Sequence, residues 1–425
     1  MSKISDLIAK LCPNGVEYKK LGEIATDIYR GSGILRTQVT AEGVPCVRYG
    51  EIYTTYGVWF DTCVSHTKLE YIQSPKYFEH GDILFAITGE SVEEIAKSTA
   101  YVGNEKCLAG GDIVVLKHRQ NPKYLAYALS TIEAQAQKSK GKVKSKVVHS
   151  SVPSIKEILI PVPPLEVQRE VVEVLDKFAL LTAELTAELT AELEKRKKQY
   201  EHYRDKLLKF TQGGGYKQLT LGEIATIERG NGLQKSDFIE SGCPCIHYGQ
   251  VHTRFGTATS NVLSYVSADL AKSLKVVHSG DIIMAVTSED VDCVCKCTAW
   301  VGGYDIVTGG HTAIIRHNQN AKYLSYYFQT PDFAAQKKKL AHGTKVIEVT
   351  PSKLADIKIP LPTLEKQAEV VALLDKFDKL CNDLTSGLPA EIAARKKQYE
   401  YYRDKLLNFP PSPGLRRTSK QEEAA

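Results

Sequence analysis

Apolar residues recur every three or four positions through two long stretches of the chain, residues 164–210 and 363–409. This spacing is typical of a helix that packs along another helix. The second stretch carries Gly387 and Pro389. Proline inside a helix removes a backbone hydrogen bond and costs about 3 kcal/mol, so a break is predicted there. The apolar positions of the first stretch are Phe178, Leu181, Leu185, Leu189, Leu193, Tyr200, Tyr203, Leu207 and Phe210.

The segments before each long helix show a different pattern, with short β-branched and aromatic runs punctuated by glycine. Such runs predict strands. Residues 44–54 are expected to be a strand and loop, and residues 122–138 and 321–340 are expected to be helical. The predicted domains are an N-terminal segment (1–20), a first recognition domain (21–163), a central spacer helix (164–210), a second recognition domain (211–362), a distal spacer helix (363–409) and a disordered tail (410–425).

The two halves of the chain are copies of each other. The run Leu21–Thr26 returns as Leu221–Thr226, and from Arg30 onward equivalent residues lie 199 positions apart, as Pro45 and Pro244 do. A repeat this long is a duplicated domain plus helix rather than a solenoid. The predicted fold is α+β: two homologous, mainly-β domains separated by two long antiparallel helices that form a coiled coil, with pseudo-twofold symmetry.

Composition sets the class of protein. The chain has 425 residues, 43% hydrophobic and 25% charged, with a net charge of +5, which are globular values. It has no apolar run of about 18 residues, so no membrane span is expected, and without an export signal we expect a cytoplasmic location. The ten cysteines are expected to be reduced thiols. Zinc is disfavoured because Cys293, Cys295 and Cys297 have no counterparts in the first copy.

Several motifs together resemble the specificity subunit of type I restriction-modification systems, in its IC-like subgroup. Each copy closes with Ile-x-Ile-Pro-x-Pro and then carries Leu-Glu-x-Gln, Leu-Asp-Lys-Phe and Arg-Lys-Lys-Gln-Tyr. The first long helix adds three Thr-Ala-Glu-Leu units at 182–193. The resemblance implies a non-catalytic subunit whose two target recognition domains each bind half of a split site in double-stranded DNA.

The resemblance also implies partners and cofactors. Two methyltransferase (modification) subunits would dock on the helices, and restriction subunits acting as translocases would join the complex. No cofactor is expected on this chain, while S-adenosylmethionine, ATP and Mg are expected on the partner subunits. The number of Thr-Ala-Glu-Leu units would set the spacer between the half-sites, since one unit is about 6 Å of helix and about 40° of rotation.

Candidate DNA contacts are cations for phosphates and polar groups for base edges. Two lysine clusters at matching places are candidates for phosphate contact, although such runs are often only a solvated face. They are Lys138, Lys140, Lys142, Lys144 and Lys146 in the first copy, and Lys337, Lys338, Lys339 and Lys345 in the second.

Further DNA contacts are predicted from three regions, the first of which has the pattern of a base-contacting loop. Tyr49 and Tyr248, inside the first of them, fit a core position equally well. The regions are Arg48, Tyr53, Thr54 and Thr55 with His247, Gln250, His252, Thr253 and Arg254; then Thr88 and Ser91 with Thr287 and Ser288; and finally Arg30 with Arg229.

The likeness of the two heads predicts like half-sites, which a twofold axis would arrange as an interrupted near-palindrome. The half-sites should differ where the heads differ in polar character, since arginine prefers guanine and glutamine can pair with adenine. These positions are Arg48/His247, Glu51/Gln250, Thr55/Arg254 and Asp112/His311.

Two other functions stay open at this point: a stand-alone DNA-binding regulator, and a coiled-coil scaffold without a DNA role. An adenine methyltransferase is not supported. Asn121-Pro-Lys-Tyr resembles that signature, but the second copy has Asn-Ala-Lys-Tyr and no glycine-rich cofactor loop precedes it. A helix N-cap explains this motif more simply.

Overall fold

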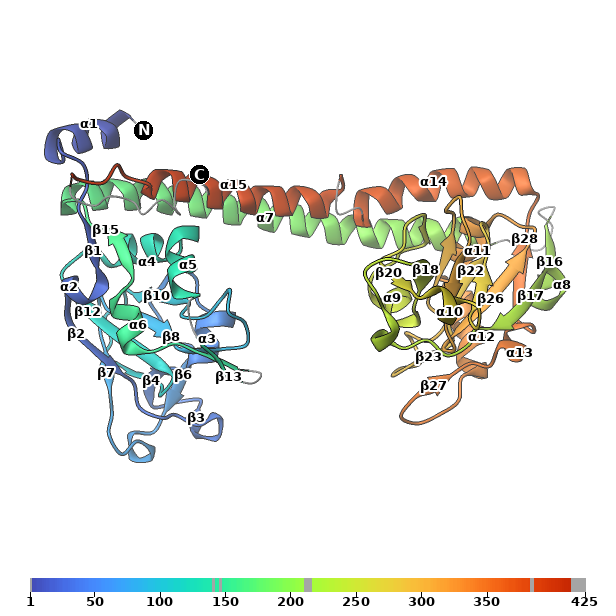
Figure 1. The fold of residues 1–425 in the computed structure, drawn as a ribbon, viewed down its shortest axis with the longest axis horizontal. Helices are drawn as coiled ribbons and strands as arrows, with labels where there is room; N and C mark the ends of the chain where they lie inside the picture. The colour runs from blue at the N-terminus through green and yellow to red at the C-terminus, as the bar shows by residue number, and fades with distance from the viewer. Residues whose placement is uncertain (1, 140–141, 145–146, 210–215, 383–385, 414–425) are drawn as a thin grey trace. The chain divides into compact units, whose positions relative to one another are not determined.

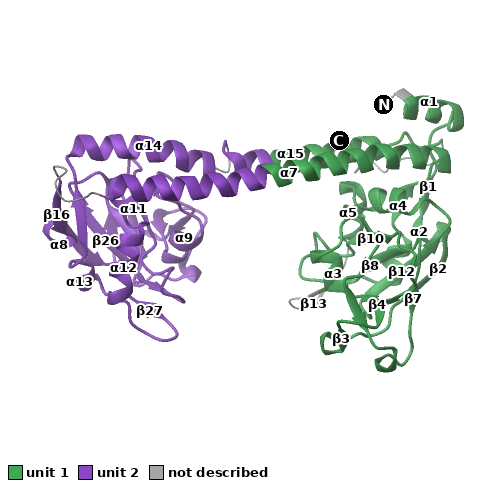
Figure 2. Cartoon of the chain, turned by 180° about the vertical axis from the view of Figure 1, so that it is seen from behind, with its two compact units in different colours: residues 1–188, 393–425 green, residues 189–392 purple. Residues whose placement is uncertain are grey.

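The computed structural model describes residues 2–139, 142–144, 147–209, 216–382 and 386–413. The chain separates into two compact units (Figure 2). Unit 1 holds residues 1–188 and 393–425, and unit 2 holds residues 189–392. Each unit contains one head together with the parts of the long helices that pack on it. The units therefore cut through the predicted spacer helices.

Head 1 is built on two five-stranded sheets, and most of their strands are labelled in Figure 1. The first has the order β2-β12-β8-β10-β5, and the second has the order β3-β6-β4-β11-β7. The first sheet comprises Ala25–Arg30 (β2), Ile113–His118 (β12), Ile83–Ala86 (β8), Ser98–Tyr101 (β10) and Trp59–Phe60 (β5). The second comprises Val39–Thr40 (β3), Ser65–Thr67 (β6), Val44–Val47 (β4), Cys107–Ala109 (β11) and Tyr77–Phe78 (β7).

Strand β8 lies at the centre of head 1 and is buried on both faces. Successive side chains of a strand point to opposite faces. Ile83 and Phe85 therefore enter one core, and Leu84 and Ala86 enter another. This arrangement explains why the strand is a continuous apolar run rather than an alternating one. Smaller pairings complete the head: Tyr18–Lys20 (β1) with Leu159–Pro161 (β15), and Lys142–Lys144 (β13) with Val147–His149 (β14), which pairs in turn with Thr88–Gly89 (β9).

Two helix expectations for head 1 were wrong in detail. The single helix predicted over 122–138 is two helices, because Thr131 caps a new start by accepting a bond from the Ala134 amide at 3.3 Å. The segment after β4 is a short helix rather than a strand and loop. The helices of head 1 are Leu21–Ile24 (α2), Tyr49–Thr54 (α3), Pro122–Leu129 (α4), Ile132–Lys138 (α5) and Val152–Lys156 (α6), with 3-10 turns at Arg36–Gln38 (η1) and Leu69–Tyr71 (η2).

Head 2 repeats the topology of head 1. Its main sheet has the order β17-β26-β22-β24-β19, and its second sheet has the order β20-β18-β25-β21. The main sheet comprises Ala225–Arg229 (β17), Thr312–His317 (β26), Ile282–Ala285 (β22), Cys297–Trp300 (β24) and Ala258–Thr259 (β19). The second comprises Ser264–Val266 (β20), Cys243–Ile246 (β18), Ile306–Thr308 (β25) and Lys275–Val277 (β21). Two pairs complete it: Lys217–Thr220 (β16) with Lys358–Leu361 (β28), and Thr287–Ser288 (β23) with Ile347–Glu348 (β27).

The helices of head 2 follow the same plan. The stretch 321–340 is again split, because Thr330 accepts a bond from the Phe333 amide at 3.3 Å. The helices are Leu221–Ile224 (α8), Tyr248–Thr253 (α9), Ala268–Ala271 (α10), Ala321–Tyr327 (α11), Pro331–Leu340 (α12) and Pro351–Leu354 (α13), with a 3-10 turn at Lys235–Asp237 (η3).

The long helices are Leu165–Leu208 (α7), Leu364–Asn382 (α14) and Leu388–Leu407 (α15). The break predicted around Gly387 and Pro389 falls where α14 ends and α15 begins. In unit 1, Phe178 of α7 packs against Tyr399 and Tyr402 of α15, each at 5.7 Å between ring centroids. In unit 2, Tyr203 of α7 stacks on Phe377 of α14, also at 5.7 Å. The helices are antiparallel, since the earlier residue of α7 meets the later residue of the partner stretch.

Only some residues of the predicted apolar seam pack between the long helices. Leu181 is 62% exposed and its equivalent Leu380 is 39% exposed, so both point away from the helix pair. The Thr-Ala-Glu-Leu block drifts around α7 because each step of four residues overshoots one helical turn. Its threonines bond back along the helix, as Thr186 does to the Thr182 carbonyl at 2.7 Å.

The two ends of the chain meet in unit 1. Helix α1 (Ser2–Leu11) contacts α7 through a Lys3–Glu170 ion pair of 2.6 Å. The Val16 amide donates to the Pro410 carbonyl at 2.8 Å, and the Ser412 amide donates to the Val16 carbonyl at 3.1 Å. The tail predicted as disordered from 410 therefore has an ordered start. The rest of that prediction, 414–425, lies outside the described residues.

Candidate nucleic-acid interface

The polar regions singled out in head 1 lie together. Thr88 of β9 and His149 of β14 face each other, with 3.2 Å between the hydroxyl and Nδ1. The Tyr53 hydroxyl of α3 donates to the Ala86 carbonyl at 3.3 Å, just before Thr88. A Cβ added at Gly89 would lie 2.8 Å from the Tyr53 hydroxyl, so α3 and β9 are in close contact. Folding thus gathers three segments that are far apart in the sequence.

Head 2 forms the same cluster with different side chains. The ring of His252, on α9, lies 3.0 Å from the Thr287 carbonyl through Nε2. The Thr287 hydroxyl lies 3.0 Å from Nδ1 of His311. Thr287 is buried, and Ser288 next to it is partly exposed. Both heads therefore carry a histidine against the threonine of the short strand, but from different places in the sequence.

The two arginines predicted from the turn after the first strand are exposed and anchored. Arg30 forms a 2.6 Å ion pair with Asp112 and also donates to the Gly111 carbonyl. Arg229 forms a 2.8 Å ion pair with Glu348. The Asp112/His311 difference thus changes which acid holds the arginine in each head.

Lys138 and Lys337 are buried, which contradicts the exposed position that their predicted phosphate contacts require. Lys138 is 5% exposed, and its ammonium donates to the Ser98 hydroxyl at 3.0 Å and the Leu129 carbonyl at 2.7 Å. Lys337 is 7% exposed and donates to the Asp292 and Val294 carbonyls, both at 2.7 Å. Burial disfavours the charged form and lowers the pKa of Lys138 to about 7, and it lowers the pKa of Lys337 as well.

The other lysines of the two clusters remain candidates. Lys338, Lys339 and Lys345 are exposed. The backbone of Lys142 and Lys144 forms strand β13, which pairs with β14 beside the Thr88–His149 contact. The predicted contacts at Lys140 and Lys146 lie outside the described residues.

Three residues chosen to explain a half-site difference have structural roles instead. Glu51 accepts from the Arg48 amide at 3.0 Å and from the Ser65 hydroxyl at 2.7 Å. In head 2, Gln250 accepts from the His247 amide at 3.0 Å and donates through its side-chain NH2 to the Ser264 hydroxyl at 2.7 Å. His247 is 4% exposed and its Nδ1 accepts from the Gly249 amide. Burial and the nearby Lys235 lower the pKa of His247, so its ring is a neutral cap.

The exposed ends of α3 and α9 keep their polar side chains available. Thr54 and Thr253 bond back to the carbonyls of Gly50 and Gly249, at 3.0 Å and 2.7 Å. Thr55 and Arg254 follow them and are exposed. Two further residues have less freedom. Arg48 is half-buried at the start of α3, and the Ser91 hydroxyl accepts from the Glu94 amide at 3.2 Å.

Sequence reasoning missed a lysine that braces each cluster. Lys97 donates to the Tyr53 carbonyl at 3.0 Å, and Lys296 donates to the His252 carbonyl at 3.4 Å. The repeat could have revealed them, because they are identical residues 199 positions apart. Lys97 holds the carboxyl end of α3 and Lys296 that of α9, where a cation also complements the helix dipole.

Within the described ranges, no three or more His, Cys, Asp or Glu side chains are placed to hold a metal ion. All ten cysteines are free thiols. Among the helices of the described residues, none combines the length and apolar composition needed to cross a bilayer.

A duplicated head with matching polar clusters, each packed on antiparallel helices, defines a two-headed recognition protein. The model of the type I restriction modification DNA specificity domain matches this chain twice, at residues 13–195 and 213–394. The Escherichia coli type I restriction enzyme EcoR124I/EcoR124II specificity subunit is 35% identical over 68% of this chain and 71% of its own length. A Haemophilus influenzae protein described as a putative type I restriction enzyme specificity subunit, S.HindORF215P, is 31% identical over 63% of this chain and 68% of its own length.

Solved structures share the fold. A chain from a type I restriction-modification system structure, on complex assembly and conformational transition, superposes with a TM-score of 0.68 at 19% identity, covering 93% of this chain and 98% of that one. The HsdS subunit from Thermoanaerobacter tengcongensis gives a TM-score of 0.52 at 18% identity, covering 93% and 97%. The chain belongs to the type I restriction-modification DNA specificity family, as a non-catalytic subunit that recognises DNA sequence.

Proposed function

We propose that each head contacts one half of a bipartite DNA site and that the long helices set the distance between the halves. The observation that carries the proposal is the duplicated cluster. Tyr53 with Thr88 in head 1, and His252 with Thr287 in head 2, occupy equivalent positions at the end of a short helix and on a short strand. One recognition surface built twice in one chain suits two similar half-sites, arranged as an interrupted near-palindrome.

The half-sites would differ mainly at the base pairs facing Thr55 and Arg254. Among the four differing positions, this pair is exposed in both heads, whereas Glu51 and Gln250 form the same internal cap. Arginine favours guanine through its two parallel donors, while threonine has no such preference. Phosphates would be contacted by the exposed lysines of each cluster and by Arg30 and Arg229.

Two copies of a methyltransferase subunit would dock on the helices, one in each unit. Large apolar side chains are exposed at equivalent places around Phe178 and Phe377, and they form what we call the apolar patches. Patch 1 is Val174, Leu181 and Tyr402, at 41%, 62% and 43% exposure, and patch 2 is Leu373, Leu380 and Tyr203, at 42%, 39% and 38%. Val174 and Leu181 lie two turns apart on one helix face. The same surface present twice suits two copies of one partner.

The catalytic chemistry would reside in the partners. S-adenosylmethionine would be bound by the methyltransferase subunits, and ATP and Mg by restriction subunits. The family match, together with the fold shared with a structure on complex assembly of a type I system, supports partner subunits in general. The rival functions, a stand-alone regulator or a scaffold, gain no support from the family match.

The decisive experiment is to express the chain with its methyltransferase subunit and map methylated adenines by single-molecule sequencing. One bipartite motif is expected. Native mass spectrometry of the same complex should show two methyltransferase copies, and Val174→Asp with Leu181→Asp should leave one. The matched Leu373→Asp with Leu380→Asp should also leave one, and all four changes should leave none. Two copies retained in both double variants would refute the docking surfaces, whereas a continuous motif would refute the bipartite site.

A further inference from the structure

The head and the long helix are clamped together at the same place in both units. Lys123 of α4 pairs with Asp176 of α7 at 2.7 Å, and Tyr127 donates to the same carboxylate at 2.7 Å. In unit 2 Lys322 pairs with Asp375 at 2.7 Å, and the Tyr326 hydroxyl also donates to it at 2.7 Å. The equivalent residues lie 199 positions apart, so the two clamps can be compared directly.

We call the Lys123–Asp176–Tyr127 contacts clamp 1 and the Lys322–Asp375–Tyr326 contacts clamp 2. Clamp 1 has a third member, the indole of Trp59. Its Nε1 donates to Asp176 at 3.2 Å, and the Lys123 ammonium lies 3.6 Å from the ring centroid. The indole is therefore held by a cation on its face and a carboxylate at its edge, both of which favour an aromatic ring with an N–H group.

Clamp 2 lacks this ring, because residue 258 is alanine where the first copy has Trp59. The lysine and carboxylate are correspondingly more open. The side chains of Lys322 and Asp375 are 35% and 37% exposed, against 25% and 29% for Lys123 and Asp176.

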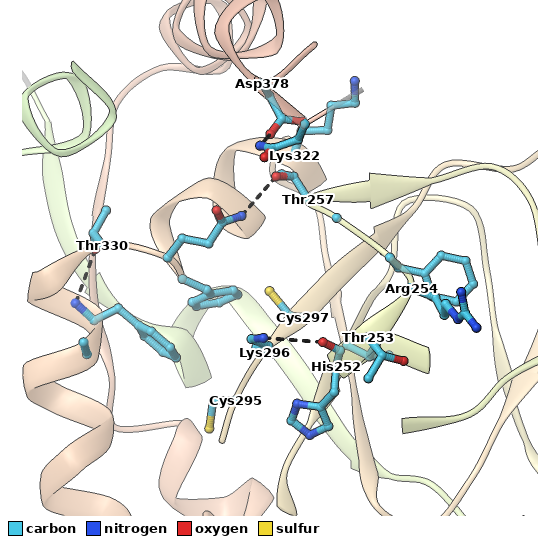
Figure 3. A pocket seen from close by; sticks show the side chains of 18 of the residues that line it. His252, Thr253, Arg254, Thr257, Cys295, Lys296, Cys297, Lys322, Thr330 and Asp378 are labelled. Carbon is cyan, nitrogen blue, oxygen red and sulfur yellow. Dashed lines mark hydrogen bonds between the residues drawn. The ribbon is translucent and has the colours of Figure 1, made fainter. Parts of the chain in front are cut away.

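A cavity of about 920 Å³ adjoins the open clamp (Figure 3). Lys322 and Asp375 line it, and Asp378 extends the same wall of α14. Thr257 lines it from the residue before Ala258, with its hydroxyl held by the Gln329 amide at 3.0 Å. Figure 3 shows Lys322, Asp378 and Thr257 grouped at one end of the cavity. The cavity is larger than an indole ring, and a cation, carboxylates and polar side chains line it.

We propose that head 2 binds a small, planar heteroaromatic molecule with a ring N–H group, such as an indole or a purine base, in the place that Trp59 occupies in head 1. The ring would lie against the Lys322 ammonium and donate its N–H to Asp375. In clamp 1, the Trp59 side chain thus fills the position that the ligand would take in clamp 2. Because the site touches α14 and head 2 together, its occupant would brace that head on the helix as Trp59 braces head 1.

Indole is the probe of choice, titrated into the full-length chain by isothermal titration calorimetry. One molecule per chain is expected. Ala258→Trp should fill the site with a tethered indole and abolish binding, and its own melting curve would show that it folds. N-methylindole, which has no N–H donor, should bind about tenfold more weakly or worse, since a hydrogen bond to a charged group is lost. No heat with the wild-type chain, or undiminished binding to Ala258→Trp, would overturn the proposal.

Trp59→Ala is the matched variant in head 1. It empties clamp 1 and should raise the stoichiometry from one indole to two, while Trp59→Ala with Ala258→Trp should bind one. Adenine, titrated in parallel, distinguishes a purine from an indole as the preferred ring. A single site in Trp59→Ala would show that an open clamp does not suffice, and would count against the proposal.

Discussion

The Tyr127 hydroxyl donates a 2.7 Å hydrogen bond to Asp176, and this bond joins head 1 to the long helix α7. A second residue of α7 completes the joint: the buried Gln168 accepts from the Asn121 amide at 2.9 Å. In unit 2, Tyr326 with Asp375 and Gln367 with Asn320 repeat both contacts. The Gln and Asp of the two helix motifs are thus the residues that fix each head on its helix.

Tyr127→Phe should destabilise unit 1, because it removes one hydrogen bond to a charged acceptor while keeping the buried ring. The expected loss is about 1–2 kcal/mol of unfolding free energy, measured by denaturant titration. Tyr326→Phe is the matched variant, and it should cost at least as much because, among the described residues, Asp375 then keeps its bond to Lys322 without a counterpart of the Trp59 bond. Unchanged stability in both variants would argue against the clamp.

Lys138 should make stability depend on pH in the alkaline range. Burial, reinforced by the nearby Arg403, lowers the pKa of Lys138 from 10.5 to about 7 in the folded chain. Between these values the unfolded chain binds a proton that the folded chain does not, so stability should rise with pH, at most by about 1.4 kcal/mol per unit. Below pH 7 both states are charged, and the full cost of burial remains.

Lys138→Met should therefore remove this rise when unfolding is followed by denaturant titration from pH 7 to pH 10. Lys338→Met is the control, since that side chain is exposed. A wild-type curve parallel to that of Lys138→Met would mean that the buried amine keeps its ordinary pKa.

Lys338 and Lys339 should contribute to the salt dependence of DNA binding, whereas Lys337 should not. Each phosphate contact adds about 0.9 to the slope of log affinity against log salt. Lys338→Ala with Lys339→Ala should lower the slope by about one to two, measured by fluorescence anisotropy with the methyltransferase complex. Lys337→Met should leave the slope unchanged because its ammonium is bonded internally. The opposite ranking would mean that the buried lysine turns outward on DNA.

Exchanging Thr55 and Arg254 should change the bases recognised. Thr55→Arg should make the first half-site resemble the second at one base pair, and Arg254→Thr should relax the second. Adenine methylation mapping measures both. Glu51→Gln is the control: it keeps an acceptor oxygen for the internal cap, so the half-sites should stay as they are. Unchanged methylation motifs in both Thr55→Arg and Arg254→Thr would exclude this position from base recognition.

Deleting one Thr-Ala-Glu-Leu unit, residues 186–189, should shorten the spacer by one or two base pairs. The deletion removes about 6 Å of helix, and a base pair rises about 3.4 Å. Neither head contains these residues, so both half-sites should persist in the methylation map. Altered half-sites with an unchanged spacer would contradict the ruler.

The sequence identified what repeats, because duplication and helical periodicity are recorded in residue order. The two heads, the antiparallel helices and the interruption after Asn382 follow from spacing and from Gly387 and Pro389 alone. Asp176 and its copy Asp375 can also be located in the sequence, as the aspartates of the Leu-Asp-Lys-Phe motif. Nothing in the spacing, however, indicates that each binds a tyrosine and a lysine of the preceding head.

Tertiary structure decided which polar residues face outward. Lys138 and Lys339 both belong to lysine-rich runs, yet one is buried and the other exposed, because the end of α5 packs on the sheet. Gln250 resembled a base-contacting residue, and its amide caps a helix. The exposure of a charged side chain depends on elements distant in sequence, so composition and period cannot settle it. The same is true of Ala258: the significance of a missing ring there is apparent only from head 1, where the indole of Trp59 contacts Lys123 and Asp176.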